Sequence, residues 1–258
     1  EIQLDNVSPI ADRFLAALLT TPINSERGRW AGDLLSRWNG AMDIDLPEPL
    51  IFAAWLRELT RATFADELGP EFLRHWSYRP SFMEQVLTPN TPEARWCDNI
   101  ATPQQESCDA LIDESLEKAL ISLEDEFGSD RAKWRWGDAH FSFHDHNPFS
   151  AIPILSDLFT LKEPSPGGFY TINRGGHWFA DESPFANVHG SGYRAIYDMS
   201  SFEDSEFIQS TGQSGNIFSP FYDNLLKKWA EGQYIKMNID YEALKKSAAG
   251  TLILVPVP

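Results

Sequence analysis

Apolar residues in the first half of the chain recur at the three- and four-residue spacing of amphipathic helices. The clearest stripe comprises Leu111, Ile112, Leu116, Ala119, Leu120, Leu123 and Phe127. Before it, Thr102-Pro103-Gln104-Gln105 has the pattern of a capping box, and Gly128 follows the last apolar position. The pattern therefore predicts a helix that starts near Thr102, ends at Gly128 and buries one face.

Similar spacing, with Ser-Pro, Gly-Pro and Thr-Pro pairs at the starts, predicts further helices in this half. They are expected over residues 8–19, 25–38, 47–68, 70–76 and 81–87. Residues 1–133 are thus predicted to form a mostly helical segment.

From about residue 134 onwards, glycine pairs and aromatic residues alternating with polar ones replace the helical spacing. A strand is predicted over residues 168–173. The period-two stretches 193–198 and 206–211 are expected to pair as antiparallel neighbours. Residues 134–258 are therefore predicted to be strand-rich and to form one structural unit with residues 1–133.

The end of the chain adds two helices and a strand to this prediction. Ser219-Pro220 is expected to start a helix that stops at Gly232, and Asp240 to start another. Residues 251–255 are predicted to form a terminal strand.

The charge excludes two classes of partner. The chain has 38 acidic and 21 basic residues, a net charge of −17 that repels phosphate backbones and anionic lipids. Its longest apolar runs, residues 49–56 and 252–258, are eight and seven residues long, whereas a bilayer span needs about 20. We expect neither nucleic acid nor a membrane as a partner.

Two cysteines, Cys97 and Cys108, have ten residues between them. This spacing suits a small disulfide loop and matches no zinc-finger pattern. A disulfide would indicate an oxidising compartment such as a periplasm. Two unpaired core thiols remain the alternative.

Three histidines, His140, His144 and His146, stand within seven residues and would share one face if the segment were a strand. Imidazoles in such a cluster can hold zinc, which leaves a zinc hydrolase as one alternative. The neighbouring Asn147-Pro148 instead favours an irregular loop with imidazoles bonded to backbone carbonyls.

The segment Gly212-Gln213-Ser214-Gly215 resembles a nucleophile elbow, but its glycines lack the required spacing around the serine. We interpret it as a structural turn whose glycines adopt positive φ. The other glycine pairs lack the spacing of phosphate loops, so no cofactor is expected.

Six segments, taken in order, resemble the penicillin acylase (penicillin amidase) family. They are residues 34–40, 134–140, 166–175, 192–199, 210–216 and 219–232. The resemblance covers essentially the whole chain. It implies an α+β fold, the C-terminal part of an αββα N-terminal nucleophile hydrolase sandwich, with helices followed by antiparallel strands.

In that family, the N-terminal serine of the β chain attacks an amide, and its own α-amine is the general base. Glu1 has no hydroxyl, and Phe221 stands where members often have histidine. The resemblance thus implies the C-terminal portion of a β chain, with no catalytic residue and no metal ligand to assign.

The expected function is hydrolysis of an N-acyl amide, in a β-lactam side chain or an acyl homoserine lactone. The serine nucleophile would lie outside this chain, which alone is predicted to be inactive. Its expected partners are the α chain, the N-terminal part of the β chain and a small amide substrate. The resemblance further implies autoprocessing, a role in antibiotic metabolism and a periplasmic or secreted location. A catalytically silent binding or scaffold domain is the alternative from another class.

Overall fold

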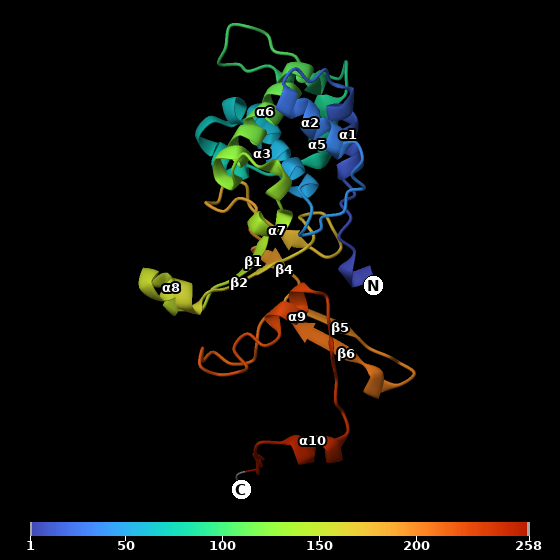
Figure 1. The fold of residues 1–258 in the computed structure, drawn as a ribbon, viewed down its shortest axis with the longest axis vertical. Coiled ribbons are helices and arrows are strands. Elements are labelled where there is room, and N and C mark those ends of the chain that lie inside the picture. Colours follow the sequence, from blue (N-terminus) through green and yellow to red (C-terminus); the bar gives the residue numbers. More distant parts are fainter. Residues whose placement is uncertain (1, 257–258) are drawn as a thin grey trace. The chain divides into compact units, whose positions relative to one another are not determined.

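The computed structural model describes residues 2–256. The chain divides into two compact units, Glu1–Gly190 and Ser191–Pro258 (Figure 1). The change from helical to strand-rich sequence at residue 134 thus falls inside the first unit. The physical reason is that Trp134 and Trp136 are fully buried in the same hydrophobic core as the preceding helices.

The first unit begins with helices, and the predicted positions are largely confirmed. They are α1 (Ala11–Thr20), α2 (Glu26–Leu35), α3 (Glu48–Leu68), α4 (Phe72–His75), α5 (Pro80–Leu87), α6 (Cys108–Phe127) and α7 (Trp136–Ala139). A short 3-10 turn, η1 (Ile2–Leu4), precedes α1, and three others lie between the helices: η2 (Gly69–Glu71), η3 (Pro92–Cys97) and η4 (Arg131–Lys133). No described helix is long and apolar enough to cross a bilayer.

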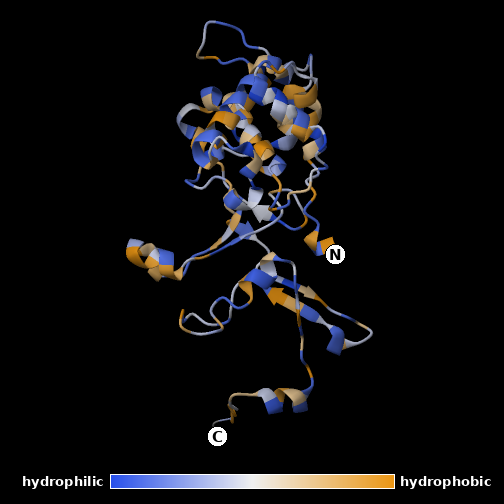
Figure 2. Cartoon of the chain, in the orientation of Figure 1, coloured by the Kyte–Doolittle hydropathy of each residue, from blue (hydrophilic) through white to orange (hydrophobic). Residues whose placement is uncertain are grey.

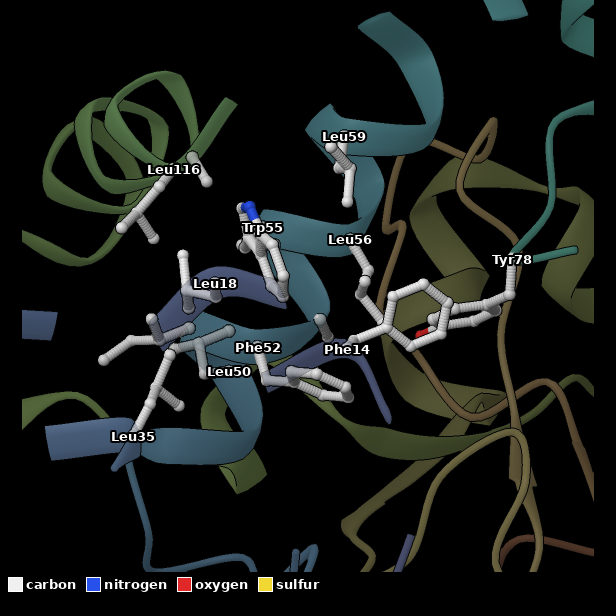
Figure 3. Packing of buried hydrophobic residues seen from close by; sticks show 14 of the residues in the cluster. Phe14, Leu18, Leu35, Leu50, Phe52, Trp55, Leu56, Leu59, Tyr78 and Leu116 are labelled. Atoms are coloured by element: carbon white, nitrogen blue, oxygen red, sulfur yellow. The ribbon is translucent and has the colours of Figure 1, made fainter. Parts of the chain in front are cut away.

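The core of this unit lies where α3 packs against α6. Trp55 of α3 is fully buried, and Leu116 of α6 and Leu18 of α1 belong to the same cluster (Figure 3). On the surface, Arg27 of α2 forms ion pairs with Glu117 and Glu124 of α6 at 3.0 and 2.8 Å. The apolar stripe predicted from the sequence is therefore the buried face of α6.

The predicted start of α6 is wrong, although Gly128 ends the helix with a φ of +84°. The N-cap is Ser107, whose side chain accepts a hydrogen bond from the amide of Ala110. The hydroxyl of Thr102 donates to Glu106 instead, and the Glu106 amide donates to Asp98. These bonds hold the preceding segment as a loop, so the helix starts six residues after Thr102.

Two small antiparallel pairs complete the first unit. They are β1 (Phe141–His144) with β2 (Leu161–Pro164), and β3 (Gly175–Gly176) with β4 (His189–Gly190). Between β1 and β2 the chain forms η5 (Phe149–Ala151) and α8 (Pro153–Phe159).

The strand predicted over residues 168–173 is wrong. The hydroxyl of Thr171 accepts from the amide of Gly168 and donates to the carbonyl of Asn173. These local bonds fold the segment into a turn, which a hydroxyl two or three residues away can do.

The second unit contains a three-stranded antiparallel sheet of order β5 (Tyr193–Ile196), β6 (Glu206–Gln209) and β7 (Ile235–Lys236). The predicted pairing of β5 with β6 is confirmed, and Arg194 lies opposite Ile208. The unit also has η6 (Phe202–Asp204), α9 (Leu226–Ala230) and α10 (Tyr241–Ser247).

Two predictions for this unit need correction. The helix expected from Ser219 starts only at Leu226, because turns occupy residues 219–225. Residues 251–255 form no strand, since their apolar side chains are exposed and no neighbouring strand pairs with them in the described part of the chain. Asp240, in contrast, caps α10 as predicted by accepting from the Glu242 amide.

Candidate functional site

A buried polar cluster lies beside the helical core of the first unit. Its centre is Tyr78, whose hydroxyl is 2.5 Å from Nε2 of His177. The ring of His140 packs edge-on against that of His177, with centroids 5.7 Å apart. Nδ1 of His140 is 2.6 Å from the carbonyl oxygen of Phe185, and its ring stacks on Trp136 at 4.4 Å.

Burial keeps both imidazoles of this cluster neutral. Loss of solvation lowers the pKa of His140 from 6.5 to about 4. The same cause, strengthened by neighbouring His140, lowers the pKa of His177 to about 3. Burial also raises the pKa of Tyr78 well above its usual 10.0.

Short-range backbone packing holds the cluster in place. A side chain at Gly175 would meet Nε2 of His140 at 2.2 Å, so only glycine allows this approach. The Asn187 amide group donates to the hydroxyl of Ser165, and the Ser165 amide donates to the carbonyl of His140. The partners of the two imidazoles are thus a phenol, a backbone carbonyl and aromatic rings, an arrangement that supports structure.

The zinc alternative does not agree with this geometry. His140 is fully buried and engaged with Phe185, while His144 ends β1 and His146 lies among the rings of Phe149 and Phe159. The described residues contain no group of three or more His, Cys, Asp or Glu side chains placed to hold a metal ion. Within residues 2–256, His140, His144 and His146 therefore do not come together as a zinc site.

Cys97 and Cys108 form a disulfide, as their spacing favours. It joins the end of η3 to the first residue of α6, with Cys97 buried. The alternative of two unpaired thiols is therefore wrong.

A groove of about 740 Å³ lies beside this disulfide, between α1, α5 and the start of α6. Phe14, Leu87 and Ile112 supply apolar lining, and Glu106 and Asp109 supply carboxylates. Its lining contains no imidazole, and its one cysteine is in the disulfide. The groove can bind an apolar group, and the hydroxyl of Thr21 in its lining donates a hydrogen bond to the carboxylate of Asp109 at 3.4 Å.

A smaller polar pocket of about 170 Å³ surrounds Arg57 and Glu126. The Arg57 Nε donates to the carbonyl of Phe179 at 3.1 Å, and its guanidinium lies 4.6 Å from the ring centre of Trp76. Burial lowers the pKa of Arg57 and raises the pKa of Glu126. This arginine joins the helices to the loop that carries Phe179.

The Gly212-Gln213-Ser214-Gly215 segment is folded by its backbone onto the chain before α9. The amides of Gly212 and Ser214 donate to the carbonyls of Tyr222 and Phe221 at 2.9 and 3.0 Å. The Ser214 hydroxyl accepts from the Asn216 amide. The prediction of positive φ is wrong for both glycines. Gly212 is required instead because a Cβ there would lie 1.9 Å from the Phe221 carbonyl oxygen.

The fold is that of an acylase-like protein with mixed helices and sheets. It resembles a solved thermostable penicillin G acylase from Alcaligenes faecalis with a TM-score of 0.54 and 16% identity. The match covers 98% of this chain and 48% of the acylase chain.

The sequence relationship is more specific: the chain belongs to the penicillin amidase family, whose model matches residues 1–246. An acyl-homoserine lactone acylase, QuiP, from Pseudomonas syringae pv. syringae is 29% identical over 234 residues. QuiP from Pseudomonas aeruginosa is 28% identical over 231 residues. These alignments cover 85% and 81% of this chain and 27% of each relative. The chain thus spans about a quarter of the length of these curated relatives.

The sequence did not point to Tyr78, His177 or Asn187. His177 is 99 positions from its hydroxyl partner, and no spacing pattern connects residues so far apart.

Proposed function

We propose that this chain is part of an amidohydrolase that cleaves the amide of an N-acyl compound. The observation that carries the proposal is the family match over residues 1–246, together with acyl-homoserine lactone acylases among the relatives. The proposed substrate is an acyl homoserine lactone or a β-lactam with an acylated side chain. The proposed architecture is the supporting part of an αββα N-terminal nucleophile hydrolase.

The nucleophile in this proposal is an N-terminal serine released by autoprocessing, outside residues 1–258. Its hydroxyl attacks the amide carbonyl and forms an acyl ester, and the amine leaves with the proton taken by the serine's α-amine. Water then hydrolyses the ester to the free acid. An α-amine suits this role because its pKa lies near 8, close to working pH.

Features of this chain support a role outside the chemical step. Both cysteines are held in the disulfide, and His140 and His177 are buried, neutral and bonded to structural partners. Ser214 uses its hydroxyl within its own turn. The chain's proposed part is to pack against the portion that carries the serine.

The disulfide also supports the proposed location in the periplasm or outside the cell, where disulfides persist. Cell fractionation of the producing organism tests this location. Recovery of the protein in the cytosolic fraction would contradict it. A role in antibiotic metabolism follows only if the substrate is a β-lactam.

Hydrolysis of N-octanoyl homoserine lactone and of a chromogenic phenylacetyl amide tests the function. Release of homoserine lactone is measured by mass spectrometry for residues 1–258 alone and for the protein expressed from its own gene at natural length. We expect turnover only from the latter, with a serine at the N-terminus of one processed chain. Turnover by residues 1–258 alone would overturn the proposal that the nucleophilic serine lies outside these residues. No turnover by either preparation would favour a catalytically silent scaffold.

A further inference from the structure

A hairpin with a helical tip extends from the first unit. Its stem is β1 paired with β2, in register from Phe141 opposite Pro164 to His144 opposite Leu161. Its tip consists of η5 and α8, which stand away from the helices α1–α6 (Figure 1).

The tip has its own internal packing. The ring of Phe159 lies 4.9 Å from that of His146 and 4.7 Å from that of Phe149, measured between centroids. The hydroxyl of Ser150 accepts from the His146 amide at 2.8 Å. Because these contacts fix its shape, the tip is a formed element that presents a defined outer face.

Apolar side chains of the tip are exposed to solvent. Ile154 is 88% exposed, Leu158 59% and Ile152 47%. The ribbon of α8 carries both hydrophobic and hydrophilic colours (Figure 2). Ile154 and Leu158 are four positions apart on α8 and therefore lie on the same side of the helix. Grouped apolar side chains exposed on one element are typical of a surface that another protein covers.

We propose that the α8 face, defined as Ile152, Ile154 and Leu158, docks onto the part of a penicillin-amidase polypeptide that residues 1–258 do not contain. This inference rests on the proposed function. Chain length favours this occupant, because residues 1–258 match only 27% of the acylase relative and 48% of the solved acylase chain. Most of such a protein therefore lies outside these residues.

Two other occupants fit the face less well. A second copy would have to bury about 800 Å² on each side for a stable pair, which three side chains do not supply. A lipid surface is disfavoured because the hairpin, residues 141–164, carries Asp145, Asp157 and Glu163 against a single lysine or arginine, Lys162. Anionic headgroups attract lysine and arginine clusters.

Photo-crosslinking tests the assignment. The protein is expressed from its own gene at natural length, with p-benzoylphenylalanine in place of Ile154 and, as the matched control, in place of Leu73. Leu73 is 64% exposed on α4 of the same unit. After photolysis, crosslinked peptides are identified by mass spectrometry, and amide hydrolysis is measured on the same preparation.

We expect the probe at position 154, and not at position 73, to join peptides of the acylase that lie outside residues 1–258. Crosslinks to a second copy of residues 1–258, crosslinks to lipid, or no crosslink would each overturn the docking. Hydrolysis reports separately on function: an active enzyme without the crosslink contradicts only the docking, whereas the crosslink without hydrolysis contradicts only the function.

A variant supplies the second measurement. The double variant Ile154→Lys with Leu158→Lys is expected to weaken the association of residues 1–258 with the rest of the acylase by at least about tenfold. Each substitution removes an apolar side chain that the docking would bury. Leu73→Lys is expected to leave this association unchanged. If the double variant associates as strongly as the wild type while its circular dichroism is unaltered, the proposal is overturned.

Discussion

The hydroxyl of Tyr78 lies 2.5 Å from Nε2 of His177, and both side chains are buried. The two residues come from the segment before α5 and the segment after β3, so the bond joins the helical part of the first unit to its strand-containing part. Rings of Phe179 and His140 pack around His177. The pair is therefore a polar link inside an aromatic cluster.

Tyr78→Phe is expected to lower the free energy of unfolding by about 1–3 kcal/mol, because the His177 ring would stay buried without its hydroxyl partner. Urea unfolding followed by tryptophan fluorescence measures the loss. Tyr170→Phe, at a half-buried ring that packs on Tyr78, is the control and should change stability by less than about 0.5 kcal/mol. Equal losses for the two variants would contradict the role of the hydrogen bond.

Acid is expected to destabilise the first unit through its buried histidines. The pKa values of His140 and His177 are about 4 and about 3 in the folded chain, against 6.5 for an ordinary histidine. The unfolded chain therefore binds more protons below pH 6.5, and stability falls as the pH drops toward 3. Each of the two histidines should lower the free energy of unfolding by about 2 kcal/mol when the pH falls from 6.5 to 5.

The comparison of urea unfolding near pH 7 and near pH 5 checks this prediction. In His177→Gln the difference between the two pH values should shrink, since one titrating group is gone. His75→Gln, at an exposed position on α4, should retain the full difference. An undiminished pH difference in His177→Gln would assign the acid sensitivity to other groups.

The helical half of the fold follows from periodicity in the sequence because each helix buries a stripe in a single core. The stripe around Leu116 and the glycine at 128 located α6 and its end. Its start was misplaced because Thr102 and Ser107 both have capping chemistry. Contacts of the loop, namely Glu106 with Thr102 and Asp98, decide between them. Those contacts follow from the folded loop and not from local spacing.

Residues 134–258, which the sequence predicted to be strand-rich, were less predictable because local hydrogen bonds compete with strand pairing. Thr171 turns the backbone where alternation suggested a strand, and Gly212 is fixed by a carbonyl from Phe221, nine positions away. The disulfide could be predicted from the spacing of Cys97 and Cys108. The Tyr78–His177 pair could not, since only the tertiary fold brings these two residues together.

The Cys97–Cys108 disulfide is expected to stabilise the chain by about 3 kcal/mol, because it closes a short loop and restricts the unfolded state. Thermal unfolding with and without a phosphine reductant measures this effect. The double variant Cys97→Ser with Cys108→Ser should melt lower and be insensitive to the reductant. A wild-type melting temperature that reductant leaves unchanged, with free thiols demonstrated, would contradict the stabilising role.

Gly212→Ala and Gly215→Ala form a matched test of the turn in the second unit. A Cβ at Gly212 would lie 1.9 Å from the Phe221 carbonyl oxygen, whereas nothing lies within 4 Å of a Cβ at Gly215. Neither glycine has positive φ, so backbone strain does not separate the variants. Gly212→Ala should therefore destabilise the second unit by about 1–3 kcal/mol, as overpacking does, and Gly215→Ala should not.

Hydrogen exchange measures the effect locally, at the backbone amides of positions 212 and 214. These amides donate to the carbonyls of Tyr222 and Phe221. Equal exchange rates in the two variants would show that the close approach of Phe221 is not what requires glycine at position 212.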